Sequence, residues 1–144
     1  MTFSMKRTIL FLISSLCVAL MVVGCCDCRK LAKSAKPFVG TKWQLVQLMG
    51  QEMASGGEDF TLVLHDNGML SSRGACNNAT TSYRMTTSRE FSVGELATTK
   101  AMCRNMALEQ SFFDMLSKVS HYEIDRDMLL LLSDGTLVAI LQAR

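Results

Sequence analysis

The stretch Gly74-Ala75-Cys76-Asn77-Asn78 and the later Cys103 carry the side chains of this chain that are best suited to chemistry. Two cysteine thiols can join as a disulfide, remain free as small apolar core groups, or act as nucleophiles. An asparagine such as Asn77 bonds nearby backbone groups in a turn or contacts a ligand. For Asn77 the turn is the better interpretation, and the ligand role is the alternative.

A catalytic thiol is the least supported of these interpretations. A nucleophilic Cys76 requires a neighbouring base that holds it as a thiolate. His65 and His121 are the only histidines of the chain, and neither lies within a recognisable motif. We therefore predict no catalytic residue, no cofactor and no enzyme activity. A thiol redox protein that uses Cys76 remains a weak alternative.

The N-terminal residues indicate export and a lipid anchor. An apolar run over residues 9–23 follows two basic residues, which is typical of a secretory signal and short for a membrane span of about 20 residues. The run ends at Val22-Val23-Gly24-Cys25, which resembles the bacterial lipobox, the motif at which a cysteine is lipidated and becomes the new N-terminus. We predict a lipoprotein signal peptide over residues 1–24 and lipidation of Cys25, because two or more acyl chains anchor a protein stably. Plain secretion and an uncleaved anchor are the alternatives.

Removal of the signal leaves a chain with balanced charge. The full chain carries a formal net charge of +2, and both excess cations, Lys6 and Arg7, belong to residues 1–24. The 13 acidic side chains are then matched by as many basic ones. Because no basic field remains, we exclude nucleic acid as a partner. The membrane is the predicted partner through the lipid on Cys25, and the periplasmic side of the bacterial envelope is the predicted location.

The cysteines left after processing favour a disulfide. If Cys25 carries lipid, an even number of thiols remains outside the cytoplasm, where such thiols pair. We predict a bond between Cys76 and Cys103, which closes a loop of about 28 residues and stabilises the domain by about 3–4 kcal/mol in the chain-entropy model. Cys26 and Cys28 could pair with each other or with another chain, stay free, or bind Cu(I) with methionines. Because the methionines have core spacing, we predict no metal site.

The remaining chain is interpreted as a tether followed by one β-rich domain. Residues 25–37 are basic and small and end at Pro37, which is typical of a flexible tether. The domain spans residues 38–144. In it, Asn67-Gly68 predicts a hairpin whose two turn residues both have positive φ. Alternating apolar residues predict strands over 42–48, 60–65, 69–75, 83–85, 91–93, 121–124, 128–132 and 137–141, and residues 77–82 are expected to form a loop.

One helix is expected, over residues 105–119, with Asn105 as its N-cap and Glu109 on its solvent side. Its apolar stripe consists of Leu108, Phe112, Met115, Leu116 and Val119. The last two strands are continuously apolar, so both of their faces are expected to be covered. The expected fold is mainly β, of the α+β class: a curled or barrel-like antiparallel sheet with one packed helix, in which Trp43 is a core anchor.

Several of these residues together resemble the META domain, also called the HslJ-like domain. The resemblance covers about residues 38 to 142. Its most specific parts are Gly74-x-Cys76-Asn77 and Thr98-Thr99-x-x-Met102-Cys103. The surrounding spacing also matches, through Trp43-x-Leu45, Phe60-x-Leu62-x-Leu64, Tyr83, Phe91-x-Val93, Glu109-x-x-Phe112-Phe113-x-x-Leu116, Tyr122 and the strand 129–132.

This resemblance implies a compact, mainly antiparallel, barrel-like fold with one helix against it. Many members look like envelope lipoproteins, and some are linked to heat shock or antibiotic tolerance. The family has no agreed catalytic residues, so none carries over to this chain. The sequence departs from the family pattern at Ala75 and Ser82, where glycine is usual, and both turns are expected to be less tight here.

The leading hypothesis is a non-enzymatic, lipid-anchored envelope protein that acts in envelope maintenance or in stress and antibiotic tolerance by binding another envelope component. A hypothesis from a different class is a carrier or sensor that holds a small apolar ligand inside the barrel. Large phenylalanine and leucine side chains at inward positions favour a filled barrel over this alternative.

Overall fold

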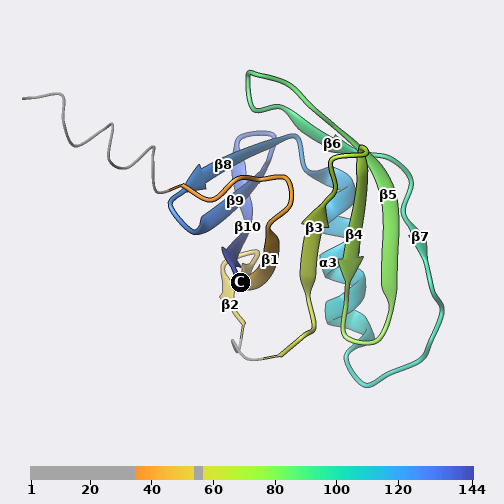
Figure 1. Ribbon diagram of the computed structural model, residues 1–144. Coiled ribbons are helices and arrows are strands. Elements are labelled where there is room, and N and C mark those ends of the chain that lie inside the picture. Colours follow the sequence, from red (N-terminus) through yellow and green to blue (C-terminus); the bar gives the residue numbers. More distant parts are fainter. Residues whose placement is uncertain (1–34, 54–56) are drawn as a thin grey trace, which may run out of the picture. The chain divides into compact units, whose positions relative to one another are not determined.

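The computed structural model describes residues 35–53 and 57–144, which form one sheet and one helix (Figure 1). The predicted signal peptide, Cys25, Cys26 and Cys28 lie outside the described residues. The elements in chain order are β1 (Lys42–Leu48), β2 (Gln51–Glu52), β3 (Thr61–Leu64), β4 (Met69–Arg73), β5 (Asn78–Met85), β6 (Phe91–Val93), β7 (Ala97–Thr98), α3 (Met106–Lys118), β8 (His121–Asp125), β9 (Met128–Ser133) and β10 (Thr136–Ala143). Within the described ranges, no helix is long and apolar enough to cross a membrane.

The sheet curls until its two outer strands meet. Its order is β6-β5-β4-β3-β1-β10-β9-β8, and β2 and β7 are short additions to β1 and β5. Beside the outer strands, Phe91 N donates to Ser120 O (2.9 Å) and Tyr122 N donates to Arg89 O (3.0 Å). These two backbone bonds join the β6 end of the sheet to the β8 end. The prediction of a barrel-like antiparallel sheet with one helix is therefore confirmed.

The hairpin between β3 and β4 forms at Asn67-Gly68 as predicted, but by a different turn. Gly68 has a φ of 79°, whereas Asn67 is not among the residues with positive φ. Gly68 N donates to His65 O (3.2 Å), and His65 N donates to Met69 O (2.8 Å). This pattern is a three-residue loop with glycine in the left-handed position, which needs only one residue at positive φ.

A bulge in β1 changes which of its side chains face inward. The strand pairs with β10 in one register up to Leu45 and in a shifted register from Gln47 onward. Strict alternation along a strand would place Leu48 on the opposite face from Trp43 and Leu45. The extra residue at Val46 returns Leu48 to the inner face, where it is buried.

The predicted loop over residues 77–82 is wrong, because β5 begins at Asn78. Ala79 and Thr81 point inward and are buried, and exposed residues alternate with them. Small and hydroxyl side chains hid a period-two strand that pairs along its first five residues with β4. Ser82, expected in a turn, lies inside this strand.

The helix and the large apolar side chains of the sheet fill the space that the curled sheet encloses. Figure 1 shows α3 behind β3, β4 and β5, and the ring of Phe112 on α3 meets that of Phe60 edge-on at 5.7 Å. Trp43 is fully buried and donates through Nε1 to Phe38 O (3.0 Å), so its predicted role as a core anchor is confirmed. The largest side chains with less than 2% exposure are Trp43, Phe91, Phe112, Leu45, Leu62, Leu64, Leu70, Met115, Leu116, Leu129, Leu131 and Leu141.

Candidate functional site

Helix α3 carries a buried carboxylate, Glu109, to one end of the β4–β5 hairpin. The helix spans Met106–Lys118, as predicted to within one residue at each end, and Asn105 precedes it without a side-chain cap bond. Glu109 is only 4% exposed, so its assignment to the solvent side is wrong. It lies three residues before Phe112 and four before Phe113, and these spacings put it on the helix face that packs against the sheet.

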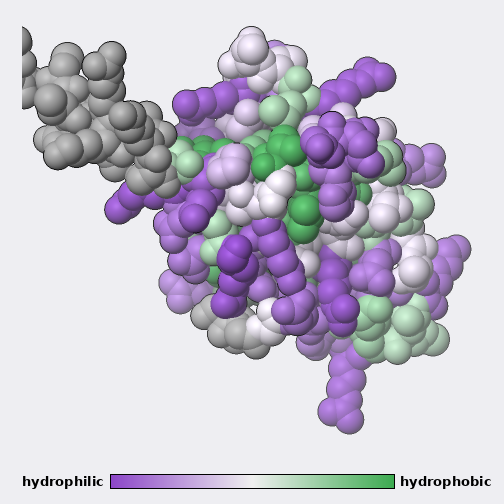
Figure 2. All heavy atoms as spheres, viewed as in Figure 1, coloured by the Kyte–Doolittle hydropathy of each residue, from purple (hydrophilic) through white to green (hydrophobic). Residues whose placement is uncertain are grey.

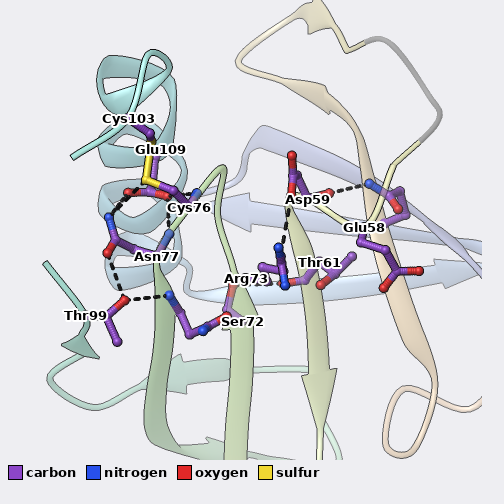
Figure 3. Close-up of polar contacts among 12 residues, drawn as sticks. Glu58, Asp59, Thr61, Ser72, Arg73, Cys76, Asn77, Thr99, Cys103 and Glu109 are labelled. Atoms are coloured by element: carbon purple, nitrogen blue, oxygen red, sulfur yellow. Dashed lines mark hydrogen bonds and ion pairs between the residues drawn. A yellow bond between two sulfur atoms is a disulfide. The ribbon is translucent and has the colours of Figure 1, made fainter. Parts of the chain in front are cut away.

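Three N–H groups of the β4–β5 connection bind this carboxylate (Figure 3). Oε2 accepts hydrogen bonds from Cys76 N (2.8 Å) and Asn77 N (2.9 Å). Oε1 accepts one from Asn77 Nδ2 (2.6 Å). Buried backbone N–H groups need partners, and a carboxylate is a strong acceptor for them. The helix therefore supplies the acceptors that the connection lacks, although Glu109 lies 33 positions after Cys76 and 32 after Asn77 in the sequence.

Gly74 leaves room for the carboxylate to approach. A Cβ added at this position would lie 2.5 Å from Glu109 Oε2 and 2.6 Å from its Cγ. Gly74 N also donates to Asn77 O (2.8 Å), which closes the connection on itself. The glycine in the Gly74-x-Cys76-Asn77 motif is therefore explained by contact with α3.

The side chain of Asn77 joins three segments of the chain. Nδ2 donates to Glu109 Oε1 and to Ala101 O (2.9 Å). Oδ1 accepts hydrogen bonds from Thr99 Oγ1 (2.8 Å) and Ala101 N (2.7 Å). The four bonds use the full capacity of the amide, so Asn77 links the start of β5, the segment that follows β7, and α3. The predicted local turn is replaced by a long-range junction.

A disulfide between Cys76 and Cys103 closes the same junction. Their Cα atoms lie 6.3 Å apart, within the range that a disulfide spans. The bond ties the end of the β4–β5 connection to the segment that enters α3. We call the assembly of Gly74, Cys76, Asn77, Thr99, Ala101, Cys103 and Glu109 the Glu109 corner.

Hydrogen bonding decides the charge of Glu109. Burial raises the pKa of this carboxyl, but the N–H groups of Cys76 and Asn77 outweigh burial and hold the pKa below its ordinary value. An ordinary glutamate has a pKa of about 4.3. Glu109 is therefore ionised at neutral pH. Oriented N–H dipoles stabilise its charge, and no residue in 35–53 or 57–144 forms a salt bridge with it.

The sulfur atoms of Cys76 and Cys103 and a carboxylate oxygen of Glu109 lie within 4.8 Å of one another. These atom types are ligands for zinc-like ions, but in the disulfide each sulfur is bonded to the other. Neither histidine reaches the cluster, because His65 Nε2 bonds Ser71 Oγ (2.9 Å) and His121 Nδ1 bonds Ser120 Oγ (3.1 Å).

A hollow of about 340 Å³ opens beside the Glu109 corner. Asn77 and Glu109 lie at its inner wall, and Lys100, Met102 and Met106 at its rim. Met102 is 91% exposed and Met106 42%. Figure 2 shows weakly hydrophobic residues at the lower right of the visible face, where Figure 1 shows β7 leading into α3. The hollow thus combines exposed thioethers with one lysine.

A family model described as the META domain matches residues 36–144 of this chain. Among solved structures, a protein from Burkholderia xenovorans is 20% identical with a TM-score of 0.59, covering 74% of this chain and 83% of its own. A DUF4847 family protein from Bacteroides vulgatus is 16% identical with a TM-score of 0.57, covering 74% of this chain and 93% of its own. At these identities the likeness concerns the fold alone. No curated protein matches the chain.

Proposed function

Because the chain belongs to the META domain family, we propose that it is a non-enzymatic, lipid-anchored protein of the bacterial cell envelope. It acts in envelope maintenance or in stress and antibiotic tolerance by binding another protein of the envelope. The observation that carries the proposal is the Glu109 corner, which uses its polar groups to hold the fold and places an exposed methionine rim beside them.

The bonding at the corner supports a structural role over a catalytic one. Cys76 is joined to Cys103, so the thiolate that a thiol enzyme requires is absent from this form. The Asn77 amide and the Glu109 carboxylate bind each other and the backbone. A carboxylate that accepts hydrogen bonds from several N–H donors is a weak base, because its pKa is held low.

The rim of the hollow supports a binding role. Methionine adapts its shape to different apolar partners, and Met102 and Met106 expose their thioethers on either side of Cys103 in the sequence. Lys100 lies at the same hollow and suits an acidic group on the partner. The disulfide holds this segment in place, which lowers the entropy lost on binding.

The start of the domain lies on the other side from this rim in Figure 1, where residues 35–40 run beside β8. Lys36 N donates to Arg126 O (2.7 Å) in the β8–β9 turn. The described part of the domain therefore begins away from the rim. The lipobox-like Val22-Val23-Gly24-Cys25 is the support for the anchor itself.

The anchor is tested by labelling cells with palmitate and separating membranes from soluble protein. We expect label and membrane retention in the wild type, and loss of both in Cys25→Ala. Cys28→Ala is the matched control, because it changes a neighbouring cysteine outside the lipobox. Equal retention of wild type and Cys25→Ala without label would refute the lipid anchor.

The binding face is tested with a photo-crosslinking residue at Met102 in intact membranes. Met85 is the matched control, because it is also an exposed methionine but lies on β5 outside the lining of the hollow. We expect an adduct of defined mass with one envelope protein at Met102 and none at Met85. The same adducts at both positions, or none at either, would argue against this face.

The filled interior gives no support to the alternative of an apolar-ligand carrier. Among the described residues, the inward positions hold large side chains such as Trp43, Phe91 and Phe112, each with less than 2% exposure. A ligand of ordinary size would have to displace them.

A further inference from the structure

The Glu109 corner holds a set of metal ligands that the disulfide masks. Two sulfurs and one carboxylate oxygen, from Cys76, Cys103 and Glu109, lie within 4.8 Å of one another. They come from three separate places in the chain, namely the β4–β5 connection, the segment before α3, and the first turns of α3. Thiolate sulfur and carboxylate oxygen are both zinc ligands, and three protein ligands leave one coordination position open.

We propose that reduction of the Cys76–Cys103 disulfide turns the Glu109 corner into a binding site for one zinc-class ion. A dithiol protein of the Cys-x-x-Cys class donates two electrons and two protons, and its own thiols become a disulfide. Cys76 and Cys103 leave this step as thiols. Zn²⁺ then binds both sulfurs, and the two thiol protons pass to water. This inference goes beyond the proposed binding role and does not depend on the lipid anchor.

The geometry permits the change without moving the backbone far. Two sulfurs on one tetrahedral zinc lie about 3.8 Å apart, given Zn–S bonds of about 2.3 Å. The Cα atoms of the two cysteines are 6.3 Å apart, and rotation of the side chains alone adjusts the sulfur separation. Oε1 of Glu109 accepts a single hydrogen bond, from Asn77 Nδ2, which leaves an acceptor site for the ion.

Asn77 supplies the outer partner that metal-binding carboxylates usually have. Its Nδ2 donates to Glu109 Oε1, and its Oδ1 is held by Thr99 and Ala101. Such outer contacts orient a ligand and are worth about 10- to 100-fold in metal affinity. The hollow beside Asn77 and Glu109 gives an ion and its water a path from solvent.

The test uses the full chain in detergent, with the N-terminal cysteines removed by Cys17→Ser, Cys25→Ser, Cys26→Ser and Cys28→Ser, so that the remaining thiols are Cys76 and Cys103. The oxidised and the phosphine-reduced protein are each mixed with Zn²⁺ and examined by native mass spectrometry. We expect about one ion per chain in the reduced form and none in the oxidised form. No ion in the reduced form, or equal binding in both forms, overturns the proposal.

Variants separate this site from chance binding to a thiol. Cys103→Ser in the same chain should weaken Zn²⁺ binding by more than the about 100-fold that an outer contact is worth. Unchanged affinity in Cys103→Ser overturns the two-thiolate site. Cd²⁺ serves as a second probe, because the charge-transfer absorption between Cd²⁺ and thiolate appears only when sulfur is bound. If the reduced chain with Cd²⁺ lacks this absorption, the two-thiolate site is also overturned.

The carboxylate is tested separately. Glu109→Gln removes a ligand, so it should weaken binding by at least the about 10- to 100-fold that an outer contact is worth, and the exposed Glu123→Gln should leave binding unchanged. If Glu109→Gln does not fold, the infrared carboxylate band of the unsubstituted site decides: it should shift on addition of Zn²⁺ to the reduced protein only. X-ray absorption should show two sulfur neighbours, and four sulfurs would mean that two chains share the ion, which contradicts a site within one chain.

Discussion

The Glu109 corner and the C-terminal meander, formed by β8, β9 and β10, are held together in opposite ways. In the meander, successive strands pair through short turns, and fully buried leucines such as Leu129, Leu131 and Leu141 supply the core. In the corner, a charged side chain, an amide and a disulfide join residues 27 to 33 positions apart. The meander depends on apolar area, whereas the corner depends on a few directed bonds.

This difference predicts how the two regions respond to change. Apolar packing is distributed over many contacts, so one substitution removes a part of it. In a buried polar network, the loss of one partner leaves other buried groups unsatisfied, so one substitution disrupts much of the network. The corner should therefore be less tolerant than the meander, although it contains fewer residues.

The largest effect is expected for Glu109→Ala. The substitution leaves three N–H groups without an acceptor, namely Cys76 N, Asn77 N and one of the two hydrogens on Asn77 Nδ2. Each buried donor without a partner costs about 1–3 kcal/mol. We expect the free energy of unfolding, measured by urea titration, to fall by at least about 3 kcal/mol.

Two substitutions in the meander calibrate this loss. Leu131→Ala removes apolar volume and should cost about 2–5 kcal/mol, while the exposed Glu123→Gln should change stability by less than about 0.5 kcal/mol. If the stability loss of Glu109→Ala is closer to that of Glu123→Gln than to that of Leu131→Ala, the buried network does not hold the corner.

The disulfide is the next largest contribution. Breaking the Cys76–Cys103 bond frees a loop whose ends are 27 positions apart, worth about 3–4 kcal/mol in the chain-entropy model. We expect a phosphine reductant to lower the urea midpoint of the wild type. The reductant should leave the midpoint of the double variant Cys76→Ser/Cys103→Ser unchanged. An unchanged urea midpoint of the wild type would mean that the hydrogen-bond network holds the corner together without the disulfide.

Gly74→Ala tests the close approach of helix and connection. The added Cβ would meet the Glu109 carboxylate at 2.5 Å, so we expect a loss of about 1–3 kcal/mol in the free energy of unfolding. Gly57→Ala is the control, because the nearest atom to its Cβ is 3.9 Å away. The shorter acid in Glu109→Asp makes room, so Gly74→Ala should cost less in that background. Additive losses would show that the two residues do not touch.

The smallest effect is a pH dependence that belongs to the corner. The folded-state pKa of Glu109 lies below its unfolded value because of the N–H groups of Cys76 and Asn77. Its contribution is present above the unfolded pKa, about 4.3, and is lost as pH falls through the folded pKa. Urea titrations from neutral to acidic pH should therefore show a steeper loss for wild type than for Glu109→Gln.

Two other carboxyls do not confuse this comparison. A hydrogen bond from Lys42 lowers the pKa of Glu58, and one from Gln142 lowers that of Asp127. Both are exposed and occur in wild type and variant alike, so the difference between the two proteins isolates Glu109. Parallel pH curves would contradict an ionised carboxylate at the corner.

The meander shows what could be predicted locally. Its strands, its Asp134-Gly135 turn and the helix before it follow from apolar periodicity and turn chemistry, which act over a few residues. The bulge in β1 and the strand β5 escaped the same reasoning. The bulge depends on pairing with β10, and β5 has too few large apolar side chains to reveal its period.

For the candidate site, the sequence by itself determined which residues mattered and not what they do. The spacing of Gly74, Cys76, Asn77 and Cys103 marked them. The sequence also contained a signal for the burial of Glu109, which lies three and four residues before Phe112 and Phe113 on the helix. An acidic side chain is, however, normally assigned to the solvent side. Only the tertiary structure decided that Glu109 is buried. The reason is physical: its desolvation is offset by N–H groups that lie beside it only when the chain has folded.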